Sequence, residues 1–128
     1  MVLLGAGLPL KMPKTLLPDS SGKAAVKVIP IVSSARAAKL IFQYWGRNYN
    51  HVPDAVVVEG PLAGGHLGFK KEQINNPDYM LEKILPEVIS VIKPHEQYFN
   101  KSIPVIVAGG VHTGADIHRF MQLGAQGV

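Results

Sequence analysis

Residues 54–65 read DAVVVEGPLAGG, a run of four apolar residues that ends in Glu59 and passes into a glycine-bearing loop. The run does not alternate apolar and polar residues, as an antiparallel strand with one wet face would. It therefore predicts a strand buried on both faces within a parallel sheet. A long loop directly after such a strand is a common place for functional residues.

Similar runs recur along the chain. The expected strands are residues 2–5, 26–32, 55–59 and 103–108, with a last one that starts at Gln126. Residues 9–23 hold three prolines and a short polar cluster. This composition predicts a long, stiffened loop in the place of a crossover helix.

Three helices are expected between the later strands. Ser34 can cap the first, which runs to about Tyr44 and is ended by the glycine and asparagine that follow at positions 46 and 48. The second covers residues 77–93, where apolar residues recur at spacings of three and four. Pro86 lies inside this pattern and is expected to kink the helix or divide it in two.

The third helix is expected from about Ala115 to Leu123, with Ile117, Phe120 and Met121 on one side.

The predicted order is thus β, β, α, β, α, β, α, β. Such a chain fits a doubly wound sheet, a small complete α/β domain or part of a closed barrel. The sequence begins in a strand and stops as another strand begins, which favours roughly the second half of a TIM (β/α)8 barrel. We therefore expect residues 1–128 to be a fragment of a single barrel domain.

The composition excludes several classes of protein. Thirteen Lys and Arg against nine Asp and Glu give a formal net charge of +4, and the scattered positive residues do not support a nucleic-acid partner. The absence of cysteine excludes disulfides, thiolate metal sites and a cysteine nucleophile, and fits a reducing cytoplasm. No apolar run approaches the ~20 residues of a membrane helix. No histidine pair or acidic cluster has metal-ligand spacing. We expect a soluble, cytoplasmic protein without a metal site.

Two strand ends carry residues suited to chemistry. After the strand at 55–59, Gly64 and Gly65 allow a planar ring or a phosphate to approach the backbone, and His66 can transfer a proton near neutral pH. After the strand at 103–108, Gly109 and Gly110 precede a helix, an arrangement that can bind an anion through backbone N–H groups, helped by the helix N-terminus. Taken alone, each motif also fits a plain turn. Their joint occurrence at strand ends favours a functional site.

These motifs together carry a resemblance. The segments Ala63-Gly64-Gly65-His66, residues 103–110 and residues 123–128 closely resemble the FMN-dependent nitronate monooxygenases, formerly called 2-nitropropane dioxygenases. The related flavin enoyl-acyl-carrier-protein reductases share the same motifs. The similarity extends over nearly all 128 residues.

The resemblance implies a TIM barrel that holds FMN at its C-terminal face. It implies that His66 is the catalytic base and that the flavin contacts or phosphate contacts come from Glu59, Ala63, Gly64, Gly65, Gly109 and Gly110. Many family members have Glu where this chain has Leu62, and often Gln where it has Glu59. The implied activity is oxidation of alkyl nitronates by oxygen.

The sequence also fits two other interpretations. The first is FMN-dependent reduction of an enoyl thioester. The second is an inactive truncated fragment, because the strands that would cover the flavin and complete its phosphate site fall outside residues 1–128. Such a half-barrel would expose two sheet edges and its apolar interior, which favours self-association. The sequence does not separate a nitronate from an acyl thioester as the substrate.

Overall fold

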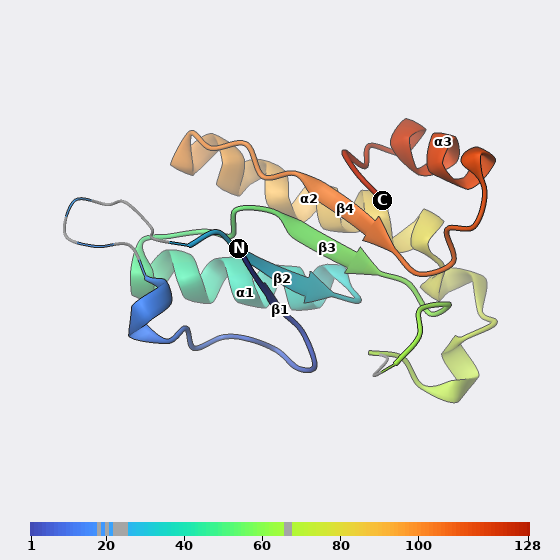
Figure 1. Ribbon diagram of the computed structural model, residues 1–128, viewed down its shortest axis with the longest axis horizontal. Helices are drawn as coiled ribbons and strands as arrows, with labels where there is room; N and C mark the ends of the chain where they lie inside the picture. Colours follow the sequence, from blue (N-terminus) through green and yellow to red (C-terminus); the bar gives the residue numbers. More distant parts are fainter. Residues whose placement is uncertain (18, 20, 22–25, 66–67) are drawn as a thin grey trace.

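The computed structural model describes residues 1–17, 19, 21, 26–65 and 68–128 (Figure 1). Its strands and α-helices are, in chain order, β1 (Val2–Leu4), β2 (Val28–Val32), α1 (Ala35–Tyr49), β3 (Val56–Glu59), α2 (Leu81–Phe99), β4 (Val105–Ala108) and α3 (Gly114–Gln122). Short 3-10 helices cover Lys14–Leu16, Lys71–Gln73 and Pro77–Tyr79. The order matches the predicted alternation, with the predicted loop rather than an α-helix among the described residues between β1 and β2.

The four strands form one parallel sheet in the order β1-β2-β3-β4. Each strand therefore lies beside its neighbours in the chain, as in part of a TIM-like barrel, whereas a doubly wound sheet reverses its strand order. The predicted last strand is present as a single parallel bridge between Gly127 and Ile106. There the amide of Val107 donates to the Gly127 carbonyl at 2.9 Å. The protein is an α/β fold of the predicted class.

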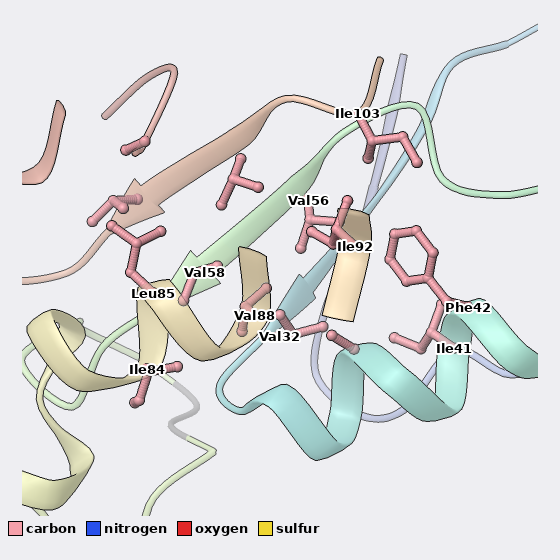
Figure 2. Packing of buried hydrophobic residues seen from close by; sticks show 14 of the residues in the cluster. Val32, Ile41, Phe42, Val56, Val58, Ile84, Leu85, Val88, Ile92 and Ile103 are labelled. Atoms are coloured by element: carbon pink, nitrogen blue, oxygen red, sulfur yellow. The ribbon is translucent and has the colours of Figure 1, made fainter. Parts of the chain in front are cut away.

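The core lies between one face of the sheet and the helices α1 and α2 (Figure 2). Along β3, Val56 and Val58 are fully buried against these helices, while Val57 is only partly buried on the opposite face. The same alternation occurs in β4. In a barrel, the face opposite the helices lines the interior. The hydrophobic core of this chain therefore corresponds to the layer between strands and helices of a barrel.

Helix α1 is longer than expected. Ser34 caps it as predicted, since its hydroxyl oxygen accepts a hydrogen bond from the Ala37 amide at 3.2 Å. The prediction that it ends near Gly46 and Asn48 is wrong, because the helix continues to Tyr49 and is capped by Asn50 in the left-handed region. Both residues are accommodated inside the helix. Gly46 packs close to Phe99, and the Asn48 side chain donates to the Tyr44 carbonyl at 2.8 Å.

Helix α2 is not divided at Pro86. It runs continuously from Leu81 to Phe99 and contains Pro94 as well. The buried side chains of this helix, including Leu85 and Val88, pack against the sheet on both sides of the first proline. Tertiary packing therefore offsets the hydrogen bonds that the two prolines remove.

The expected apolar side of α3 is only partly buried. Phe120 is 2% exposed, but Ile117 and Met121 are 42% and 45% exposed. A periodic pattern predicts which side chains share a helix face, whereas burial needs a neighbouring element. No element within the described residues covers these two side chains.

Asp54, Lys27 and Lys101 form a cluster of charges at the amino-terminal edge of the sheet. The carboxylate of Asp54 accepts a hydrogen bond from the Val28 amide at 2.9 Å and lies 3.1 Å and 3.0 Å from the ammonium groups of Lys27 and Lys101. Burial raises the pKa of Asp54, but the Val28 amide and the two lysines outweigh burial and lower it overall. The Nε2 atom of His51 is buried nearby without a hydrogen-bond partner among the described residues.

We expect the free energy of unfolding to fall as pH drops below about 6.5. Burial lowers the pKa of His51 and of His95, and the positive charge of Lys101 lowers that of His51 further. The unfolded chain then binds protons that the folded chain does not, so stability is complete above the unfolded pKa of 6.5 and is lost below it. The stabilising contribution of Asp54 is present above pH 3.8 and is lost only as pH falls below that value, because the folded state lowers its pKa.

Urea unfolding between pH 8 and pH 5 measures this dependence. His51→Gln is expected to flatten it, and His112→Gln, at an exposed loop position, is the matched control. An unchanged slope in His51→Gln would show that this histidine is not the group responsible.

Candidate functional site

The loops that follow β3 and β4 meet at the carboxyl edge of the sheet, where the arrowheads of both strands point in Figure 1. The Gly60 amide donates to the Ala108 carbonyl at 2.9 Å, which joins the two strand ends. The Ala63 amide then donates to the Gly60 carbonyl at 3.2 Å and turns the first loop back toward β4. The two segments predicted to bind a cofactor are therefore neighbours in space.

Gly109 lies directly against Ala63. A β-carbon at position 109 would be 2.8 Å from the Ala63 Cβ and 2.9 Å from its backbone nitrogen. The φ angle of Gly109 is +87°, in the region that side chains rarely adopt. Close approach and backbone conformation therefore both require glycine here.

Gly110 repeats this geometry against Leu62. Its φ angle is +81°, and a β-carbon there would lie 3.0 Å from the Leu62 Cδ1 atom. Among the described residues, the amides of Gly109 and Gly110 have no hydrogen-bond partner. A turn with successive unpaired amides can bind an anion such as a phosphate.

The surface over Gly64 and Gly65 is open. A β-carbon at either position would meet no atom within 4 Å, and Gly65 has a φ angle of +89°. Both glycines are exposed. This part of the loop can therefore accept a flat ring against its backbone.

Glu59 ends β3 on the face opposite the helices and borders a cavity of about 220 Å³. The cavity also touches Leu8, Ile31, Ser33 and Gly68. The half-buried Glu59 side chain and Gly68, which lies in the loop after β3, therefore border the same cavity. The structure therefore brings Glu59, Ala63 and Gly109 to one edge of the sheet, while His66 lies outside the described residues.

Ser33 is a further residue of this region that motif analysis did not single out. A β-carbon on Gly68 would overlap the Ser33 hydroxyl oxygen, so the two segments touch beside the cavity. The position of Ser33 directly after a predicted buried strand was the one feature of the sequence that could have indicated a role at the strand ends. Only the fold shows that it faces the loop after β3.

At the amino-terminal end of α3, two backbone amides donate to a carboxylate of the same chain. The Asp116 carboxylate accepts hydrogen bonds from the amides of His112 and Thr113 at 3.2 Å and 2.9 Å. The Thr113 hydroxyl, followed by these two amides, lowers the pKa of Asp116 and holds the carboxylate ionised. The amides of His112 and Thr113 are therefore occupied by the chain's own carboxylate.

None of the helices among the described residues is long and apolar enough to cross a membrane. Within the same residues, no three His, Asp or Glu side chains gather in a way that could hold a metal ion.

The chain is similar to known proteins in sequence. Residues 2–128 match the family model described as nitronate monooxygenase. The "Probable nitronate monooxygenase" of Staphylococcus aureus strain JH9 is 37% identical over 76 residues, which cover 59% of this chain and 19% of that protein. Proteins of the same name from strains Newman and COL give the same figures. The match thus spans about a fifth of the length of these relatives. The chain belongs to the nitronate monooxygenase family, a flavin-dependent family of oxidoreductases.

Proposed function

We propose that residues 1–128 form part of a single FMN-binding barrel domain whose activity is the oxidation of alkyl nitronates by oxygen. The observation that carries this proposal is the contact between Ala63 and Gly109, which unites the two glycine-bearing loops at the carboxyl edge of the sheet. In β/α barrels this edge is the catalytic face. Family membership supplies the class of cofactor and reaction.

The residues present fit a flavin mononucleotide. The open backbone at Gly64 and Gly65 suits a planar ring, and the unpaired amides of Gly109 and Gly110 suit its phosphate. Ala63 links the two parts, and Glu59 borders the cavity beside them. When bound, the flavin would accept electrons from the substrate and pass them to oxygen.

The chain's own residues would prepare the substrate for that oxidation. We assign His66 the role of the base that removes the proton alpha to the nitro group of a neutral nitroalkane and so gives the nitronate. The apolar side chains that border the cavity, Leu8 and Ile31 among them, would exclude water from the reacting carbon. The loop after β3 would orient the substrate against the ring, since it carries both the glycine pair and the histidine.

Gly64→Val tests the position of the ring. A valine side chain there meets no protein atom within 4 Å of its β-carbon, so the free energy of unfolding should change by no more than about 0.5 kcal/mol. The branched side chain would occupy the surface meant for the ring, and FMN affinity should fall at least about tenfold. Titration of the purified chain with FMN, followed by flavin fluorescence, measures the affinity.

Gly114→Ala is the control, because its β-carbon also meets nothing within 4 Å but lies at the start of α3. Unchanged FMN affinity in Gly64→Val would place the ring elsewhere, and a wild-type chain that binds no FMN would overturn the assignment of the cofactor site to residues 1–128. Oxygen uptake with an alkyl nitronate supports the proposed reaction. NAD(P)H-dependent reduction of an enoyl thioester, without nitronate oxidation, would replace it with the reductase activity.

A further inference from the structure

A groove between the last turns of α1 and α2 lies away from the candidate site. It encloses about 500 Å³ and is bordered by Phe42, Gly46, Arg47, His95, Tyr98 and Phe99. Both helices run opposite to the strands, so their carboxyl ends lie at the amino edge of the sheet (Figure 1). We call this the α1–α2 groove. Its volume is that of a small-molecule site.

Aromatic rings form the walls of the α1–α2 groove. The ring of His95 lies 5.0 Å from that of Phe42, which is fully buried. The rings of Tyr98 and Phe99 meet edge to face with their centres 5.0 Å apart. Tyr98 also borders the groove and is 81% exposed. Such walls favour a planar apolar group.

The electrostatics of the groove come from few groups. Burial lowers the pKa of His95, so its imidazole is neutral near pH 7. Among the described residues that border the groove, Arg47 is then the one charged side chain. None of the ion pairs in the described part of the chain uses Arg47. An unpaired guanidinium at the rim complements a carboxylate, which it can bind through two parallel hydrogen bonds.

The helix ends restrict where that carboxylate can lie. The last carbonyl groups of α1 and α2 carry partial negative charge, which repels an anion placed between them. Arg47 stands in the last turn of α1 and offsets this charge locally. A ligand would therefore keep its carboxylate at Arg47 and its ring against His95 and Phe99.

We propose that the α1–α2 groove binds a small aromatic carboxylate. The Arg47 guanidinium binds the carboxylate, and the rings of His95, Tyr98 and Phe99 enclose the aromatic part. The site is independent of the proposed flavin site, because it lies at the opposite edge of the sheet.

The test compares 2-naphthoate with the neutral 2-naphthamide by isothermal titration calorimetry on the purified chain. We expect the carboxylate to bind at least about tenfold more tightly than the amide, since a charge-assisted pair is lost in the amide. Arg47→Gln should remove this preference. Lys39→Gln, an exposed cation on the same helix that does not border the groove, should retain it.

A second variant tests the place of the ring. A β-carbon on Gly46 would lie 3.7 Å from the Phe99 ring, so a longer side chain there enters the groove without a close backbone contact. Gly46→Met should therefore weaken both probes while the helical circular dichroism is kept. Equal binding of the two probes, a preference that survives Arg47→Gln, tight binding in Gly46→Met, or no saturable binding to the wild-type chain would each overturn the proposal.

Discussion

Gly109→Ala is expected to destabilise the protein by about 2–5 kcal/mol. The positive φ angle of +87° costs a non-glycine residue roughly 1–2 kcal/mol. The new β-carbon would also lie 2.8 Å from the Ala63 Cβ and 2.9 Å from its backbone nitrogen, an overlap that costs about 1–3 kcal/mol. The overlap involves backbone, so rotation of a side chain cannot relieve it. Urea unfolding of the variant measures the loss.

Gly114→Ala is again the matched control. Position 114 lies at the start of α3, has no positive φ angle and leaves open space around a β-carbon. Its free energy of unfolding should stay within about 0.5 kcal/mol of wild type. We also expect Gly109→Ala to weaken FMN binding, because the loop of Ala63 must move away from the turn proposed to bind the phosphate. A Gly109→Ala protein as stable as wild type would disprove the close approach of the two loops.

His66→Ala is expected to lower kcat/KM for a neutral nitroalkane by at least about a hundredfold. A positioned general base contributes roughly 10²–10⁴-fold to a proton transfer. A nitronate anion has already lost that proton, so its oxidation should fall less than about tenfold. Steady-state oxygen uptake with both substrates separates proton removal from the later electron transfer.

FMN affinity serves as the internal check on this variant, because a base that acts on the substrate is not needed to hold the cofactor. It should stay within about twofold of wild type. His118→Ala, at an exposed position in α3, should leave both activities unchanged. Equal losses for the nitroalkane and the nitronate would assign His66 to substrate positioning instead of proton removal.

Much of the fold could be predicted from short-range patterns. Runs apolar on both faces, such as residues 56–58, predicted a parallel sheet, and the parallel pairing of β1 to β4 confirms it. Ser34 predicted the start of α1, because its cap depends on atoms only three residues apart. Glycines after two strands predicted a functional site at the strand ends, and the parallel pairing of β3 and β4 places both loops at one edge of the sheet.

Helix lengths and burial depended on contacts that no local pattern contains. Gly46 and Pro86 are weak helix formers, yet α1 and α2 continue through them because buried side chains on either side pack against the sheet. Ile117 has the periodicity of a core residue but is 42% exposed, because no described element lies over it.

The sequence by itself thus determined the family and the strand and helix order, and its motifs are the source of the proposed flavin-binding residues. It did not determine which backbone atoms touch. The contact of Gly109 with Ala63, 46 positions earlier by residue number, arises only when β3 and β4 pair in register. The aromatic walls around Arg47 likewise come from two separate helices. Both features depend on the packing of distant segments, and that packing is decided by the tertiary structure alone.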